Sequence, residues 1–244
     1  MNTRNNRVTV VTGGASGIGA AIVEAMAAPG SPVVVLDRDV SDAPQPADAA
    51  GPHAVRCDIT DPDAVSAAVQ QVNEGWGPVG VLVNCAGVAS IAPALDLELA
   101  GWEQTLRVNL TGTFLMSQAV APQMIEQGSG RIINIASQAA TVALHDHAAY
   151  AASKAGVVGL TKVLALEWGG SGITVNAVSP TVVLTELSKP IWENPGGDAL
   201  KAQIPAGRFA QPHEIAATVA FLASDEAAMI NGVDLLVDGG YTIR

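Results

Sequence analysis

The stretch Thr12–Gly19, which reads TGGASGIG, follows directly on the apolar run Val8–Val11. Glycine is unfavourable inside helices and strands, so such a cluster predicts a turn with unusual backbone angles or a close backbone approach. The next residues, Ala20–Ala28, repeat apolar side chains at helical spacing. A strand, a glycine-rich turn and a helix in this order form the context in which α/β proteins bind dinucleotides.

The glycines of this turn have separate tasks. We expect Gly13 to allow a sharp turn, Gly17 to leave room for a pyrophosphate, and Gly19 to let the helix pack close to the sheet. The start of the helix, with Ser16 and Ile18, then offers free N–H groups to the phosphates. The glycine spacing is GxxxGxG rather than GxGxxG. Taken alone, the turn is also compatible with a tight connection that binds nothing.

Seven short apolar runs along the chain alternate with segments of helical spacing, and no linker divides them. Strands that are apolar on both faces and alternate with helices predict a parallel sheet covered on both sides. We therefore predict one α/β domain over residues 1–244, a Rossmann-type doubly wound fold with a seven-stranded parallel sheet and helices on both faces. The predicted strands are Val8–Val11, Val33–Leu36, Val55–Ile59, Val79–Asn84, Arg131–Ala136, Thr174–Val178 and Asp234–Val237.

Composition excludes several classes of protein. The net charge of −11, with no basic stripe, argues against nucleic acid as a partner. No apolar run reaches the roughly 18 residues of a membrane-spanning helix, and no secretory signal follows the N-terminal residues. Cys57 and Cys85 each end an apolar run and are expected to be buried thiols rather than disulfide or zinc ligands. We expect a cytoplasmic protein that binds neither membrane nor nucleic acid.

Motifs further along the chain extend the evidence from the glycine turn. TGGASGIG resembles the cofactor turn of the short-chain dehydrogenase/reductase family, and other motifs of that family occur in the same order. The resemblance covers the whole chain and implies a nicotinamide cofactor and hydride transfer between an alcohol and a carbonyl. These motifs are Asn84-Cys85-Ala86-Gly87, Asn109, Ser137, Tyr150-Ala151-Ala152-Ser153-Lys154 and Asp238-Gly239-Gly240.

Asp37 indicates which nicotinamide cofactor is bound. It ends the second predicted strand, about 20 residues past the glycine turn, where a carboxylate binds the ribose hydroxyls of NAD. The same charge repels the extra phosphate of NADP. NADP-dependent members of the family usually carry a basic residue inside the turn, where this chain has Ala15 and Ser16. Arg38 instead favours NADP, because an arginine there can reach the 2′-phosphate of that cofactor. We predict NAD.

Five further positions correspond, by the resemblance, to residues around the adenosine half of the cofactor. Asp58 and Ile59 close the third predicted strand and are expected at the adenine ring. Asn84, Ala86 and Gly87 end the fourth strand, beside the ribose and diphosphate. All of them lie at carboxyl ends of predicted strands, where open α/β sheets bind ligands.

Tyr150 and Lys154 are four residues apart, which places them one turn apart on the same face of a helix. A nearby ammonium group, together with the positive nicotinamide ring, is expected to lower the pKa of the phenol so that it acts as acid and base. Ser137, at the end of a strand, can hold the substrate oxygen beside it. By resemblance, the main chain of Asn109 holds a water that connects Lys154 to solvent.

The segment after the sixth predicted strand reads Ser-Pro-Thr-Val-Val-Leu-Thr. Pro180, the main chain of Val183 and the hydroxyl of Thr185 match the positions that hold the nicotinamide in the family, and Lys154 is expected to bond its ribose. Thr181 stands where the family usually has glycine. Residues from about 185 to 205 form the longest irregular stretch, and we predict that they are a substrate lid.

Polar residues just before the tyrosine favour a hydroxylated substrate. His147 is expected to contact it, and His145 and Asp146 either do the same or form an exposed loop. Trp192 in the lid either closes over the ligand or anchors the lid. No His/Asp cluster has metal-ligand spacing. Together with the C-terminal motif that begins at Asp238, these features resemble the sugar-alcohol dehydrogenases of the family, nearest to the tetritol (threitol-type) enzymes.

Other functions stay open at this point. A reductase of 3-oxoacyl chains on acyl carrier protein is the main alternative, a hydroxysteroid oxidoreductase is another, and a non-catalytic NAD-binding regulator is a remote one. Met124–Gly128 and Leu164–Trp168 lack the basic residues that an acidic carrier would need. The helices near Trp102–Gln127 and Lys154–Trp168 are apolar on more than one face, which predicts a homotetramer.

Overall fold

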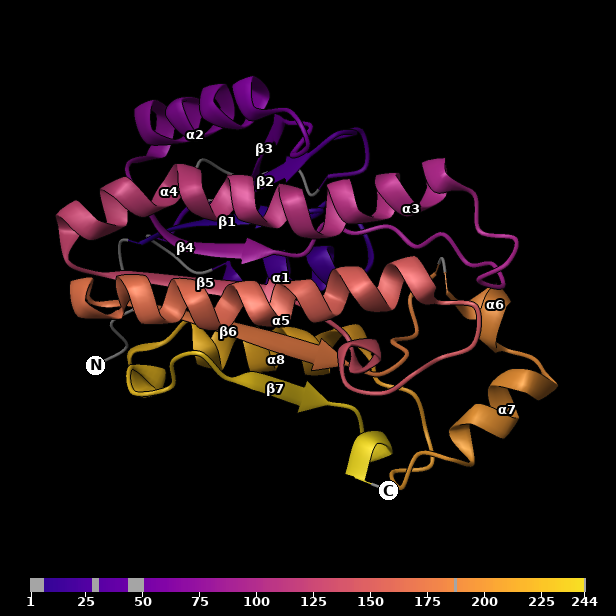
Figure 1. Ribbon diagram of the computed structural model, residues 1–244. Coiled ribbons are helices and arrows are strands. Elements are labelled where there is room, and N and C mark those ends of the chain that lie inside the picture. The colour runs from indigo at the N-terminus through magenta and orange to yellow at the C-terminus, as the bar shows by residue number, and fades with distance from the viewer. Residues whose placement is uncertain (1–6, 28–30, 44–50, 187, 244) are drawn as a thin grey trace.

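The computed structural model describes residues 7–27, 31–43, 51–186 and 188–243. Seven parallel strands form one sheet in the order β3-β2-β1-β4-β5-β6-β7 (Figure 1). This confirms the predicted Rossmann-type fold. The strands are β1 Val8–Thr12, β2 Val33–Asp37, β3 His53–Arg56, β4 Val79–Asn84, β5 Gly130–Ile135, β6 Ile173–Pro180 and β7 Asp234–Val237.

Helices cover both faces of the sheet (Figure 1). On one face α2, α4 and α5 pack against the side chains of one set of strand positions, and on the other face α1 and α8 pack against the alternate set. Strands buried on both faces account for their near-continuous apolar sequences. The helices are α1 Gly17–Met26, α2 Pro62–Trp76, α3 Leu99–Leu106, α4 Thr113–Gln127, α5 Ala148–Trp168, α6 Lys189–Trp192, α7 Pro195–Lys201 and α8 Pro212–Leu222.

Two predictions differ most from the structure, the bounds of the third strand and the irregular lid. The third strand is placed two to three residues too late, because the pattern misses His53 and because the chain turns where Asp58 accepts hydrogen bonds from the N–H and hydroxyl of Thr60. The predicted irregular lid contains two short helices, α6 and α7. Asn194 caps the second by accepting from the N–H groups of residues 196 and 197, a local signal that the sequence already carried.

Helix α5 is, by length and composition alone, apolar enough to cross a membrane together with the turn that follows it. In the fold it lies along the sheet (Figure 1), where Val157, Leu164 and Ala165 are buried. A long core helix of an α/β domain has this composition because it packs against the sheet and against neighbouring helices.

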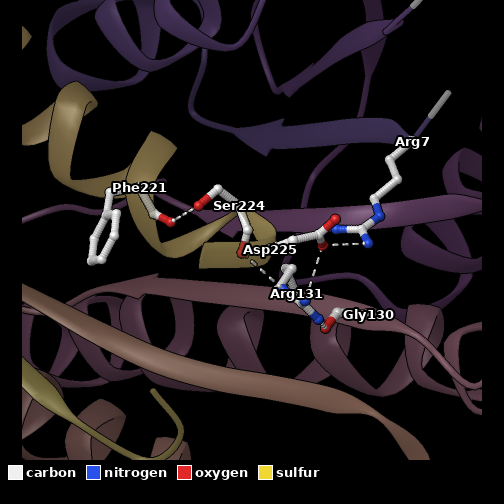
Figure 2. Close-up of polar contacts among 6 residues, drawn as sticks. All are labelled: Arg7, Gly130, Arg131, Phe221, Ser224 and Asp225. Carbon is white, nitrogen blue, oxygen red and sulfur yellow. Dashed lines mark hydrogen bonds and ion pairs between the residues drawn. The ribbon is translucent and has the colours of Figure 1, made fainter. Parts of the chain in front are cut away.

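A charged cluster connects the start of β5 with the residues before β1 and after α8 (Figure 2). The buried guanidinium of Arg131, at the start of β5, lies 3.3 Å from the Asp225 carboxylate, and Arg7 lies 2.8 Å from the same oxygen. Arg131 also donates to the carbonyl oxygens of Gly130 and Ser224. Burial lowers the pKa of Arg131, so the partners are needed to keep this charge inside the fold.

Candidate active site

A cavity of about 960 Å³ opens at the carboxyl edge of the sheet. Its wall is built from residues that follow strands β1 to β6, from the start of α5 and from the segment that holds α6 and α7. Its volume is at the upper end of the range of about 300–1,000 Å³ typical of ligand sites. The position is the one that doubly wound sheets use for ligands.

The glycine turn forms one end of this cavity. Gly13 has a φ of +67°, and a Cβ atom there would lie 2.7 Å from the Cα of Ala86, so the close approach of the two strand ends requires glycine. Ser16, Gly17 and Ile18 line the cavity where α1 begins. The N–H groups that no helical carbonyl reaches therefore lie at the cavity wall, which fits a phosphate.

The predicted role of Gly19 needs correction. A Cβ atom on Gly19 would lie 2.0 Å from the carbonyl oxygen of Gly13, so this glycine lets the helix pack against its own preceding turn. Gly14, in the turn before α1, lies against the sheet, since its Cβ would lie 3.0 Å from the side chain of Val35 in β2. Gly14 was not singled out by the sequence, although it lies between two positions that were.

The carboxylate of Asp37 lies beside the glycine turn. One of its oxygens accepts from the N–H of Ala15 at 3.4 Å, and the other from the N–H of Asp39 at 3.3 Å. Both bonds are long, so the carboxylate keeps capacity for stronger donors such as ribose hydroxyls. Arg38 is exposed and also lines the cavity. The cavity therefore contains both the carboxylate that favours NAD and the arginine that favours NADP.

Asp58 and Ile59 also line the cavity. Asp58 accepts from the N–H of Thr60 at 2.9 Å and from its hydroxyl at 2.8 Å. These two bonds lower the pKa of Asp58, so the side chain is a carboxylate and hydrogen-bond acceptor at neutral pH. Ile59 is buried, and a Cβ atom on Gly112 would lie 2.6 Å from it. An apolar side chain beside an acceptor suits a purine ring.

The structure places the side chain of Asn84 in the core and not in the cavity. Its amide donates to the hydroxyl of Ser117 at 3.1 Å and to the side chain of Asn134 at 2.8 Å. This corrects the prediction for the Asn84 side chain. Asn84 is the last residue of β4, where side chains still alternate between the two faces of the sheet, and it points to the face that α4 covers. Ala86 and Gly87 do line the cavity, as predicted.

Thr12, which the sequence reasoning missed, holds this loop in place. Its hydroxyl accepts from the N–H groups of Cys85 and Ala86, at 3.1 and 3.2 Å. The ends of β1 and β4 are thereby fixed against each other beneath the cavity. A threonine at the end of a strand and directly before the glycine turn was the available signal.

Asn109 lies in a π-helical turn, Arg107–Gly112, between α3 and α4. Its side-chain oxygen accepts from the N–H of Val88 at 2.8 Å, and its amide donates to the carbonyl of Val88 at 2.9 Å. The wider turn explains how a buried helical asparagine reaches this loop, and such turns often mark functional sites. The sequence predicted an ordinary helix here.

The predicted catalytic residues come together in the lining of the cavity. The ammonium of Lys154 lies 5.7 Å from the centre of the Tyr150 ring and donates to the carbonyl of Ile135 at 2.6 Å. Ser137 follows β5 and is buried, and its hydroxyl accepts from the N–H of Ala139 at 3.1 Å. Ser137, Tyr150 and Lys154 all line the cavity.

The predicted lowering of the phenol pKa is not found in the protein by itself. Burial raises the pKa of Tyr150, while a hydrogen bond with Ser137 acts in the opposite direction and Cys85 adds to the increase. Burial also lowers the pKa of Lys154 to about 8. The desolvation of both groups outweighs the attraction of a lysine that is bonded to a carbonyl. The positive nicotinamide ring, which the prediction also invoked, is not part of the protein.

The end of β6 and the segment after it line the cavity as predicted, with Pro180, Val183 and Thr185. The hydroxyl of Thr185 accepts from the N–H of Ser188 at 3.2 Å, and the Ser188 hydroxyl donates to the carbonyl of Val183 at 2.7 Å. Thr181, the departure from the family pattern, is buried, and its hydroxyl has no hydrogen-bond partner within the described residues.

The residues before Tyr150 divide between the cavity and the outside. His145 and His147 line the cavity, while Asp146 has a φ of +65° and is absent from the lining. The ring of Trp192 lines the cavity and packs edge-on against Phe209, with the ring centres 5.9 Å apart. Both roles considered for Trp192, contact with a ligand and anchoring of the lid, are therefore compatible with its position.

Several lining residues were not predicted, because they come from four separate segments that only the fold brings together. Three of them carry amides and one a phenol, so they add hydrogen-bonding groups to the lining. They are Gln104, Gln138, Leu144, Gln203 and Tyr241.

The fold and these residues define an oxidoreductase, and the chain belongs to the short-chain dehydrogenase/reductase family. The family pattern that matches residues 13–242 is described as enoyl-(acyl carrier protein) reductase. The chain is 55% identical to a D-threitol dehydrogenase of Mycolicibacterium smegmatis, over 98% of this chain and 94% of that protein. It is 45% identical to an NAD-dependent glycerol dehydrogenase of Listeria innocua, over 98% and 95%.

More distant relatives include a 3-oxoacyl-[acyl-carrier-protein] reductase of Vibrio cholerae, at 38% identity over 96% of both chains. Among solved structures, that of gox2181 superimposes with a TM-score of 0.92 at 39% identity, covering 98% of this chain and 97% of that one. A gluconate 5-dehydrogenase of Burkholderia cenocepacia, in complex with NADP and tartrate, gives a TM-score of 0.91 at 33% identity, covering 98% and 96%.

Proposed function

We propose that this enzyme oxidises a secondary alcohol of a short sugar alcohol, such as a tetritol, with NAD as the hydride acceptor. The observation that carries the proposal is the single cavity that joins the glycine turn and Asp37 to Ser137, Tyr150 and Lys154. The similarity to the D-threitol and glycerol dehydrogenases supports the substrate class.

The residues present fit a nicotinamide dinucleotide. The start of α1 suits the pyrophosphate, Asp37 suits the adenosine ribose, and the lining positions Pro180, Val183 and Thr185 suit the nicotinamide. We favour NAD because of Asp37 and because a relative is named as NAD-dependent. Arg38 and the solved relative with NADP make the comparison of both cofactors a necessary test. When bound, the nicotinamide supplies a carbon that accepts or gives a hydride.

Proton transfer in this proposal is the task of the protein. Ser137 holds the alcohol oxygen, and Tyr150 takes the hydroxyl proton as the carbon–hydrogen bond breaks and the carbonyl forms. In reduction Tyr150 returns that proton to the carbonyl oxygen. Because burial raises the pKa of Tyr150, the resting protein holds the phenol, which is ready for reduction, and oxidation requires its ionisation.

A polyhydroxylated substrate suits the polar part of the cavity lining. Each hydroxyl that leaves water must find a partner, and His147, Gln138 and Gln203 are among the residues that line the cavity. The test is a panel of tetritols, pentitols, hexitols and glycerol with NAD. Turnover that is highest with a tetritol supports the proposal, and no turnover of any polyol with either cofactor would refute it.

Reduction of 3-oxoacyl thioesters with NADPH is the second candidate, favoured by the 38% identical relative. Asp37 and the absence of Lys and Arg from Met124–Gly128 and Leu164–Trp168 argue against it. Acetoacetyl thioester with NADPH belongs in the same panel, and faster turnover of this substrate than of any polyol would replace the first proposal.

We also infer a cytoplasmic homotetramer. Phe114 and Ile125 on α4, and Val163 and Leu166 on α5, are apolar and exposed on the single chain, and such faces favour a partner. Light scattering that gives four times the chain mass supports this inference, and a monomer at micromolar concentration would contradict it.

A further inference from the structure

We propose that Ser153 is a positioning residue that ties Asn109 to the backbone of the catalytic tyrosine. Ser153 lies on α5 between Tyr150 and Lys154 and is fully buried. Its hydroxyl donates to the carbonyl oxygen of Tyr150 at 2.7 Å and accepts from the side-chain amide of Asn109 at 2.9 Å. The inference rests on the proposed role of Tyr150 but not on the identity of the alcohol.

The side chain of Asn109 is fully engaged. Its oxygen accepts from the N–H of Val88, and its two N–H groups serve the carbonyl of Val88 and the hydroxyl of Ser153. Its backbone carbonyl accepts from the hydroxyl of Thr113 at 2.8 Å. A buried amide with all of its groups paired has one orientation, and removal of any partner leaves an unpaired polar group in the protein interior.

The hydrogen bonds form one chain from the cofactor side of the cavity to the tyrosine. Val88 belongs to the loop after β4, which lines the cavity. From there the chain runs through Asn109 and Ser153 to the backbone of Tyr150. A Cβ atom on Gly87 would lie 3.3 Å from the Asn109 oxygen and 3.6 Å from the Lys154 ammonium, so the catalytic lysine lies close to the same loop.

The helix offers a matched control for this arrangement. Thr161, also on α5 and buried, donates to the carbonyl of Val157 at 2.8 Å and accepts from the amide of Asn134 at 2.9 Å. The bonding pattern is the same, but Asn134 leads to Asn84 in the core and not to the catalytic group. Serine and threonine often bond back to helix carbonyls, so Thr161 shows what this bond does without a catalytic neighbour.

The experiment compares Ser153→Ala with Thr161→Val in the full-length enzyme. The assay uses whichever alcohol of the panel the unmodified enzyme oxidises fastest, so failure of the polyol assignment and failure of this inference are separate results. For S153A we expect kcat to fall about tenfold while the KM for NAD stays within about twofold. We also expect the pH profile of oxidation to move to higher pH, because a displaced Tyr150 loses the pKa-lowering bond with Ser137.

For T161V we expect a fall in melting temperature comparable to that of S153A, with kcat and the pH profile unchanged. Ser153→Thr, which keeps the hydroxyl, should recover most of the kcat lost in S153A. The proposal is overturned if S153A loses stability like T161V with no change in kcat or pH profile. If S153A does not fold, Ser153→Cys takes its place with the same criteria, because a thiol keeps the volume but is a weak hydrogen-bonding group.

Discussion

The ammonium group of Lys154 lies 5.7 Å from the centre of the Tyr150 ring and is bonded to the carbonyl oxygen of Ile135. The lysine therefore contributes a fixed positive charge near the phenol but not a hydrogen bond to it. Since the pKa of Lys154 is lowered to about 8 and that of Tyr150 is raised, the protein alone holds the pair as ammonium and phenol at neutral pH. This state determines how activity responds to pH.

Oxidation of the alcohol should become faster as pH rises from neutral into the alkaline range. Oxidation needs the phenolate, and a raised pKa of Tyr150 delays its formation to higher pH. The rise should flatten above about pH 8, where Lys154 loses its charge. Reduction uses the phenol and should depend little on pH near neutrality. Initial rates in both directions across pH check this, and an oxidation rate that falls with increasing pH would contradict it.

Asp37→Ala should weaken NAD binding by about 10–100-fold, because a carboxylate that accepts from two hydroxyls contributes about 1.5–3 kcal/mol. Use of NADP should be unchanged or improved, since the charge that repels the 2′-phosphate is removed. Titration of the Asp37 and Arg38 variants with both cofactors measures this. Arg38→Ala serves as the control and should leave NAD binding within about threefold. Equal losses for NAD and NADP in the Asp37 variant would contradict the assignment.

Asp225→Asn should destabilise the fold without affecting catalysis. The buried Arg131 would lose its carboxylate, and because Asp225 is partly exposed we expect about 1–2 kcal/mol and a melting temperature lower by roughly 2–8 °C. Glu74→Gln, at an exposed position, is the control and should change the melting temperature by less than about 2 °C. Calorimetry and kcat are the readouts, and a loss of kcat in the folded variant would mean that this cluster influences the distant site.

The sequence predicted the parts of this protein that depend on local pattern. Apolar runs located the strands, and the turn after Val8–Val11 predicted the cofactor end of the cavity. The motif residues Ser137, Tyr150 and Lys154 lie together as expected. Motif spacing succeeds here because each motif occupies the carboxyl end of a strand or the start of a helix, and the parallel sheet brings those ends to one edge.

What the sequence did not predict depends on contacts between distant segments. The core position of the Asn84 side chain depends on Ser117 and Asn134, and the π-helical turn at Asn109 depends on the loop that it bonds. The direction of the pKa change at Tyr150 depends on burial, which motif spacing does not give. Gln138 and Gln203 reach the cavity only through the fold.

The most direct test of the central claim is Tyr150→Phe, which removes one oxygen atom from the proposed acid and base. We expect kcat to fall by about 10²–10⁴-fold, while the dissociation constant for NAD, measured by titration, stays within about threefold. Such a split would place the phenol in the chemical step. Turnover by the variant within about tenfold of the unmodified enzyme would show that another group transfers the proton.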